Sequence, residues 1–273
     1  MPIFKKQFIK VAEAKPDFQQ LRVEDLKLAP YQRALNKKRI AQYAERYDPD
    51  IFGIILVSHR DGSYYIVDGQ HRVEVAKLLN FKTVWCQVIE GLTYEQEARK
   101  FHEINDRKVR LNANHKFHAK IEARDGTALN ILNALNRFGF NYSKEGNEFN
   151  DNMITAVGTI QKIHREQGYE GLCLVLRLIK RAWNGDKEAM RSAMLKGLNT
   201  FVTNYDFDED FLVEVLETDM PKSIIDRSKA YTHNIRRIDS GNCFHVSKMI
   251  RDMYEDRAIR TRKKNPCSRR ESA

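Results

Sequence analysis

The stretch "YYIVDGQHRVEVAKLLNF", residues 64–81, decides the fold of the first part of the chain. Its apolar start predicts a strand, Asp68 and Gly69 predict a turn, and the spacing from Gln70 onward predicts a helix. A helix that begins at this point leaves its first backbone N–H groups unpaired and carries the positive end of its dipole there. Such a helix start attracts anions.

The side chains at this turn favour a phosphate ligand. Gly69 lets the backbone turn closely, Arg72 adds a forked donor suited to phosphate, and Gln70 and His71 add further donors. The alternative interpretation is structural, with Asp68 capping the helix and Arg72 paired with an acidic neighbour. Both interpretations place these residues at a strand–turn–helix junction.

The rest of the chain divides into two regions with different secondary-structure patterns. Up to about residue 90, short strand patterns alternate with helical ones, and from Thr93 onward the pattern is helical almost throughout. The sequence therefore predicts an α+β fold, with a small mixed-sheet domain followed by an all-helical region. The predicted boundaries are 1–125 for the mixed domain, 126–259 for the helical domain and 260–273 for a basic tail too polar to pack.

Individual elements follow from local signals. Thr93 and Gln96 predict a capping box, Asn112 or Asn114 starts the next helix, and the segment 139–150 is either a short hairpin or a plain loop. The expected β-type runs cover 22–28, 53–59, 63–67 and 83–89. The other expected helices cover 36–48, 70–80, 127–138, 150–166, 169–183, 187–205, 208–217 and 246–262.

Charge and composition narrow the possible partners. The net charge is +10, and residues 99–124 alone hold eight Lys or Arg, three acids and three histidines, which indicates a polyanion partner or, more plainly, a solvated helix face. No apolar stretch predicts a signal peptide or a membrane span, and the four cysteines form no CxxC pair. A reducing cytoplasm is the expected location, with no membrane partner.

Three ordered motifs resemble the ParB and sulfiredoxin superfamily. "VDGQHRVEVAK" resembles the DGQHR form of its signature, and "LKLAPYQRALNKKRIAQYAERY" resembles the upstream strand, box and helix, with Gln32 and Arg33 in the box. "FHEINDRKVRLNANHKF" is similar to the downstream segment that reads E-N-x-x-R-x-x-L-N in ParB, and is nearer to DGQHR proteins of the DndB type. The resemblance covers residues 20–120 and gives nothing for 150–273.

The resemblance implies a nucleoside triphosphate, CTP or ATP, with Mg²⁺ near the phosphates. The family's nucleotide-binding positions fall here on Gln32, Arg33, Gly69, Gln70, His71, Arg72, Asn105 and Lys108. Ile104 stands at the family's glutamate and Lys108 at its second arginine, so the metal would fall to Asn105 with Glu103 or Asp106 as a substitute carboxylate. Sulfiredoxin needs a cysteine where this chain has Gln70, which excludes that activity.

The remaining candidate residues carry weaker signals. Asp68 and His71 are the candidate catalytic groups, although the cap role is favoured for Asp68. The residues expected to contact DNA are Arg107, Arg110, Lys116 and Lys120, together with the basic tail. His102, His115 and His118 have a spacing that suits a metal, but no cysteine or carboxylate completes the set.

Three functions fit the sequence. The first is a ParB-like DNA-associated protein of bacterial or phage or mobile-element type, which uses a bound nucleoside triphosphate as a switch for DNA binding. The second is an enzyme, an NTP hydrolase or, less favoured, a ParB-like nuclease, since no cluster of carboxylates for two metals is evident. The third is a non-catalytic scaffold or inhibitor. A homodimer and a protein partner are compatible with each.

Overall fold

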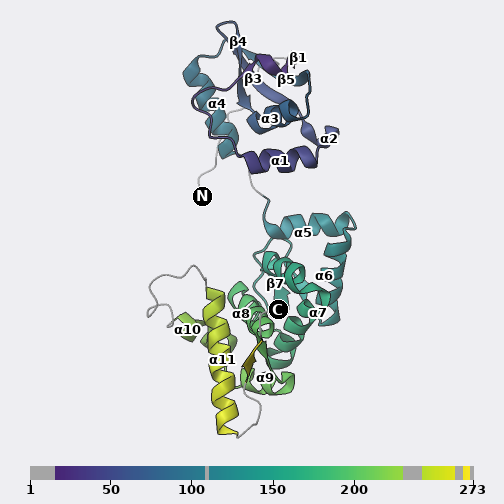
Figure 1. Cartoon of the computed structure of the whole chain (residues 1–273), viewed down its shortest axis with the longest axis vertical. Helices are drawn as coiled ribbons and strands as arrows, with labels where there is room; N and C mark the ends of the chain where they lie inside the picture. Colours follow the sequence, from purple (N-terminus) through teal and green to yellow (C-terminus); the bar gives the residue numbers. More distant parts are fainter. Residues whose placement is uncertain (1–15, 108–110, 230–241, 262–266, 271–273) are drawn as a thin grey trace, which may run out of the picture. The chain divides into compact units, whose positions relative to one another are not determined.

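The computed structural model describes residues 16–107, 111–229, 242–261 and 267–270 (Figure 1). The chain divides into two compact units, Met1–Arg110 and Leu111–Ala273. The division falls before the helix over 113–122 rather than at the expected residue 125, because that helix packs on the two helices that follow it. The α+β class expected from the sequence is confirmed.

The first unit is built on one mixed five-stranded sheet with the order β1-β5-β3-β4-β2. β1 pairs antiparallel with β5 and β3 antiparallel with β4, while β3–β5 and β2–β4 are parallel. Its elements are β1 (Asp17–Arg22), η1 (Val23–Asp25), β2 (Leu26–Lys27), α1 (Lys37–Glu45), α2 (Pro49–Phe52), β3 (Ile55–Arg60), β4 (Ser63–Asp68), α3 (Gln70–Leu78), β5 (Thr83–Glu90) and α4 (Tyr94–Asp106).

The core of this unit lies between the sheet and α3. Ile55 and Val57 of β3 are fully buried, and Val73 and Ala76 of α3 pack with them in one apolar cluster. β3 and β4 are joined at Asp61 and Gly62, which both have positive φ, as a tight hairpin requires. Helix α4 packs against β4, and α1 packs against α3.

The second unit is mainly helical (Figure 1). It contains α5 (Ala113–Glu122), α6 (Gly126–Arg137), β6 (Asn141–Tyr142), β7 (Met153–Ile154), α7 (Val157–Trp183), α8 (Ser192–Asn204), β8 (Tyr205–Asp206), α9 (Glu209–Leu216), α10 (Pro221–Ser228), α11 (Asn242–Arg260) and β9 (Ser268–Arg269). Its core is one apolar cluster that includes Leu176, Leu198, Phe201 and Tyr254, all fully buried. The closest helix pair is α8 with α11, where Gly197 lies against Val246.

Several sequence expectations differ from this structure. Segment 139–150 forms no hairpin, because β6 pairs in parallel with β7, and the helix expected from residue 150 begins only at Val157. The two helices expected over 150–183 merge across Gly168, which has non-helical backbone angles. Part of the tail expected to fray is packed, since β9 pairs with β8 and Cys267 is buried. Within the described residues, no helix is both long and apolar enough to cross a membrane.

Candidate functional site

The turn between β4 and α3 requires glycine. Gly69 is the N-cap of α3 with φ 106° and ψ 15°, and a Cβ there would lie 2.8 Å from Cδ1 of Ile55. The N-cap residue itself has no side chain, and Asp68 precedes it at the end of β4. The start of α3, with the positive end of its dipole, therefore lies at this turn.

Arg72 is held by the chain more firmly than the sequence suggested. Its Nη1 donates to the carbonyl oxygens of Phe52 and Ile54, each at 3.0 Å, and Nη2 lies 3.4 Å from Oδ2 of Asp68. Gly53, with φ 70°, makes room for the guanidinium, because a Cβ there would lie 3.0 Å from Nη1. Arg72 thus ties the loop after α2 to the start of α3, and its Nη2 contacts the carboxylate of Asp68.

A cavity of about 650 Å³ opens beside this turn. It collects residues from β4, α1, α2, α3, α4 and the segment before α1: Gln32, Arg33, Arg39, Tyr43, Ile51, Phe52, Asp68, Gly69, Gln70, His71, Arg72, Phe101 and Asn105. Three arginines thus share one cavity in which Asp68 is the carboxylate among the lining residues. Every predicted nucleotide-binding residue lines it except Lys108, which lies outside the described residues.

Two helix starts meet at this cavity. The side chain of Asn36 caps α1 by accepting from the backbone N–H of Arg39 at 3.0 Å, and the backbone N–H of Asn36 donates to Nε2 of His71 at 3.3 Å. Burial and the charges of Arg33 and Arg39 lower the pKa of His71. His71 is therefore neutral at pH 7, with its proton on Nδ1, and Nε2 is not free to act as a general base.

The side-chain amides of Gln32 and Gln70 donate to backbone carbonyl oxygens and so stabilise the fold around the cavity. Nε2 of Gln32 donates to the carbonyl oxygen of Ile66 at 2.7 Å, and Nε2 of Gln70 donates to that of Arg33 at 3.2 Å. Gln70 is 5% exposed, and its Oε1 has no hydrogen-bond partner within the part of the chain that the structure describes. Both residues hold the segment before α1 against the strand and turn.

A buried ion pair positions α4 at the cavity. Nε of Arg60 donates to Oε1 of Glu97 at 2.9 Å, and the Glu97 side chain is fully buried. Burial raises the pKa of Tyr31, whose hydroxyl lies 3.5 Å from Glu97, so Tyr31 stays a neutral donor. The capping box of Thr93 and Gln96 is confirmed at the start of the same helix. This anchoring brings Phe101 and Asn105 to the cavity wall.

The structure does not assemble the expected metal site. Nδ2 of Asn105 donates to the Phe101 carbonyl oxygen at 2.8 Å, and Glu103 lies outside the cavity, 3.9 Å from Arg107. Among the described residues, no group of three His, Cys, Asp or Glu is arranged to hold a metal. A Mg²⁺ ion would then depend on Asp68 and on oxygens of the ligand itself, which suits an ion that keeps few protein ligands.

The residues expected to contact DNA are distributed over both units. Arg107 ends α4 and is 81% exposed, while Lys116 and Lys120 lie four residues apart on an exposed face of α5. Arg110 lies outside the described residues. His115 and His118 of the same helix contact Glu145 and Tyr142, at 2.8 and 2.9 Å, and form no metal site.

Sequence reasoning missed Arg39, Tyr43, Ile51, Phe52 and Phe101. Arg39 and Tyr43 lie four apart on α1, and both Nε and Nη2 of Arg39 donate to the Tyr43 hydroxyl at 3.0 and 2.6 Å. The spacing of these two residues on a helix was a usable signal. The short α2 carried a weaker one, because Asp48 and Pro49 predict a helix start but only four residues follow.

Fold and site together define an α+β protein with an arginine-lined cavity at a strand–glycine–helix turn. The chain belongs to the family of unknown function DUF6551, whose model matches residues 27–248. No curated protein matches the sequence.

Three solved structures resemble parts of the chain. C-terminally truncated chromosome-partitioning protein ParB from Caulobacter crescentus, complexed with CTP-gamma-S, has 15% identity and a TM-score of 0.43, over 59% of this chain and 99% of that chain. Sulfiredoxin from Arabidopsis thaliana has 24% identity and a TM-score of 0.25, over 28% and 88%. A Pnob8-like ParB-N domain has 14% identity and a TM-score of 0.28, over 88% and 97%. All three TM-scores are below 0.5, so the ligand has to be inferred from this chain's own residues.

Proposed function

We propose that this chain is a DNA-associated protein that binds a nucleoside triphosphate at the Gly69 turn and uses it as a switch for DNA binding. The observation that carries the proposal is the cavity of about 650 Å³ that Arg33, Arg39 and Arg72 share with Gly69 at the start of α3. Forked guanidinium donors and helix-start N–H groups are the two protein features that suit phosphate oxygens best.

The charge balance of the cavity supports a polyanion rather than a single carboxylate. Within the described residues, neither Arg33 nor Arg39 forms an ion pair, and Asp68 is the lining residue of opposite charge. A triphosphate would supply the missing negative charge and would carry Mg²⁺ on its own oxygens. The size also fits, since small-molecule sites are typically about 300–1,000 Å³.

Arg72 supplies a mechanism for the switch. Its Nη1 is shared between two neutral carbonyl oxygens, those of Phe52 and Ile54. A phosphate oxygen is charged and makes a stronger hydrogen bond with guanidinium than a carbonyl oxygen does. A ligand phosphate in the cavity would therefore compete for Arg72, and the loop that follows α2 would change its contacts. The ligand would then favour one arrangement of this loop over another.

The proposed DNA contacts are Arg107, Arg110, Lys116 and Lys120, together with the basic tail. Such contacts to phosphate give salt-sensitive binding with weak sequence selectivity. A bacterial or mobile-element origin, a cytoplasmic location and a homodimer remain part of this proposal.

A calorimetric titration tests the ligand. CTP, ATP and GTP, each with Mg²⁺, are titrated into the wild type and into Arg33→Gln. This substitution removes a lining charge whose guanidinium forms no hydrogen bond or ion pair within the described residues. We expect binding by the wild type and about tenfold weaker binding by the variant. The absence of heat with all three nucleotides would reject the proposal. Phosphate release in the same samples distinguishes a hydrolase from a switch, and an enzyme that needs His71 as base is disfavoured by its engaged Nε2.

A mobility shift at two salt concentrations tests the DNA partner. We compare the wild type with Lys116→Gln/Lys120→Gln and, as a control, with Lys162→Gln, which removes a lysine 3.7 Å from Glu166. Each lost phosphate contact should reduce the slope of log affinity against log salt by about one. DNA affinity that does not change with salt concentration would exclude α5 as the contact surface and favour a protein-binding scaffold. An equal change of slope in the Lys162→Gln control would lead to the same conclusion.

A further inference from the structure

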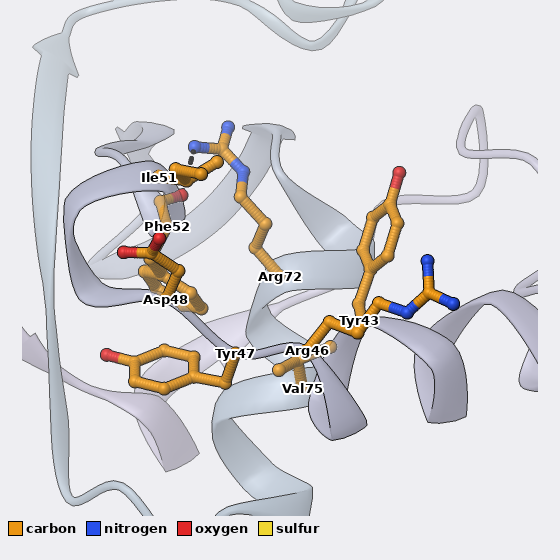
Figure 2. A pocket seen from close by; sticks show the side chains of 8 residues that line it. All are labelled: Tyr43, Arg46, Tyr47, Asp48, Ile51, Phe52, Arg72 and Val75. Atoms are coloured by element: carbon orange, nitrogen blue, oxygen red, sulfur yellow. Dashed lines mark hydrogen bonds between the residues drawn. The ribbon is translucent and has the colours of Figure 1, made fainter. Parts of the chain in front are cut away.

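A second cavity, of about 420 Å³, lies next to the arginine-lined one (Figure 2). It is lined mainly by apolar and aromatic side chains from α1, α2 and α3: Tyr43, Arg46, Tyr47, Asp48, Ile51, Phe52, Arg72 and Val75. Tyr43, Ile51, Phe52 and Arg72 line both cavities. The two cavities therefore adjoin at these four side chains. The cationic cavity lies at Gly69, and the second one, which we call the aromatic groove, is lined from α1, α2 and α3.

Figure 2 shows how the walls of the aromatic groove are arranged. The side chains of Ile51, Phe52 and Asp48 lie on one side, Tyr43 and Arg46 lie on the other, and the stem of Arg72 rises between them. Two of the polar groups are engaged: Nη1 of Arg72 donates to the Phe52 carbonyl oxygen, and Oδ1 of Asp48 accepts from the backbone N–H of Asp50 at 2.9 Å. The groove thus offers mainly side-chain faces, beside the polar ends of Arg46 and Tyr47.

Two side chains of the groove are exposed to solvent. Ile51 is 80% exposed and Tyr43 is 43% exposed. Local sequence enforces this position, because Asp48 caps α2, Pro49 begins it and Gly53 ends it with φ 70°. The chain therefore holds Ile51 outward at the junction of the two cavities.

We propose that the aromatic groove holds the base of the nucleotide whose phosphates lie at Gly69. This inference rests on the proposed function and adds how the ligand is recognised. An inorganic polyphosphate would fill only the cationic cavity, whereas a nucleotide has a planar apolar end that matches the adjoining groove. Contact with ring faces is available to every base, so the groove binds purines and pyrimidines with similar affinity. Base selectivity among ATP, GTP and CTP is expected to stay within about tenfold.

The test compares three probes, ATP, CTP and inorganic tripolyphosphate, each with Mg²⁺, by calorimetry on the full chain. The variants are Tyr47→Ala, which removes a ring that lines the groove but not the cationic cavity, and Tyr43→Phe, which keeps the ring but removes the hydroxyl that Arg39 contacts. We expect both nucleotides to bind at least tenfold more tightly than tripolyphosphate to the wild type. Tyr47→Ala should remove most of this excess and leave tripolyphosphate affinity unchanged, and Tyr43→Phe should retain the excess.

The outcomes separate this inference from the proposed function. Equal affinity for tripolyphosphate and the nucleotides would overturn the groove as base site while leaving the cationic cavity as an anion site. A preference of more than a hundredfold for one base would also overturn it, because face contacts cannot discriminate so strongly. Failure of all three probes to bind would reject the proposed function together with the inference.

Discussion

The arginines of the two units differ in what they contact. In the second unit, Arg177 donates to Glu209 through Nε and Nη2, both at 2.7 Å, and Arg181 contacts Glu209 and Asp210. In the cavity of the first unit, Arg33 and Arg39 form no ion pair within the described residues. Paired arginines join helices α7 and α9, whereas unpaired arginines gathered in a cavity indicate a ligand that brings the missing charge.

Helix capping does not separate the two units. Side chains cap α1, α2 and α4 of the first unit and α5, α6 and α9 of the second by accepting from a backbone N–H group: Asn36, Asp48, Thr93, Asn112, Asp125 and Asp208. Helix α3 begins at Gly69, which lines the arginine cavity. The difference between the units therefore lies in the cavity that gathers Arg33 and Arg39 at this helix start.

The largest expected effect concerns a buried ion pair of the first unit, between Arg60 and Glu97. Glu97→Ala would leave Arg60 without its buried partner and should lower the free energy of unfolding by about 3 kcal/mol. Nucleotide affinity should fall as well, because α4 carries Phe101 and Asn105. Urea unfolding measures the first effect, with the exposed Glu95→Ala of the same helix as control. Equal stability of the two variants would show that this pair does not anchor α4.

The next effect concerns packing in the second unit. A Cβ on Gly197 would lie 2.3 Å from Cγ1 of Val246, so Gly197→Ala should cost about 2 kcal/mol by overpacking α8 against α11. Gly126→Ala is the matched control, since no atom lies within 4 Å of its new Cβ. Thermal unfolding measures both. Nucleotide affinity, measured below the unfolding transition, should not change in either variant. A lower nucleotide affinity in Gly197→Ala would show that the second unit also contributes to nucleotide binding.

A smaller effect is expected from Arg72→Lys. Lysine keeps the charge but cannot reach the carbonyl oxygens of Phe52 and Ile54 with one planar group, so stability should fall by about 1 kcal/mol. Hydrogen exchange at residues 53–55 should become faster in the variant, and ATP should no longer change it. If ATP alters exchange there equally in wild type and variant, Arg72 is not the link between ligand and loop.

The smallest effect is the response to acid. The pKa of His71 is lowered in the folded state, mainly by burial, so the unfolded chain takes up the proton first and stability falls as pH drops below about 6.5. The pKa of Glu209 is lowered mainly by its hydrogen bond from Arg177, so the stability it contributes is lost only below about pH 4.5. The His71 effect should be below about 0.5 kcal/mol, because the ring is partly exposed.

Unfolding curves at pH 7, 6 and 5 on the wild type and on His71→Gln measure that difference. The variant should lose the slope between pH 7 and 5 and keep the slope near pH 4. An unchanged slope between pH 7 and 5 would show that His71 does not titrate in the folded state as inferred.

The sequence predicted the elements whose signals are local. The strand–glycine–helix turn at Gly69, the capping box at Thr93 and the caps Asn112 and Asp208 were each readable within a few residues. The sequence predicted either a hairpin or a plain loop over 139–150 and a helix from residue 150, and it did not show that β6 and β7 pair in parallel. Residues 143–152 separate these two strands, and no local pattern encodes a parallel pairing of two residues. The strand at Ser268 was missed for the same reason, since its partner is β8.

The sequence predicted which residues lie at the candidate site, but not the contacts that these residues make. The motifs placed Gln32, Arg33 and Asn105 near the turn, and the structure lines one cavity with them. Sequence spacing could not show that Arg72 would bind backbone carbonyl oxygens, because those belong to a loop about twenty residues earlier. It also gave no sign of the aromatic groove, whose walls are ordinary helix positions until α1 and α2 are brought together.

The most direct test of the unpaired arginines compares two double variants. ATP with Mg²⁺ is titrated into the wild type, Arg33→Gln/Arg39→Gln and Arg177→Gln/Arg181→Gln, with thermal unfolding recorded for each. Loss of the two cavity charges should weaken binding by about a hundredfold with little loss of stability, while loss of the two paired charges should lower stability and leave affinity unchanged. Equal ATP affinity in all three proteins would contradict the account.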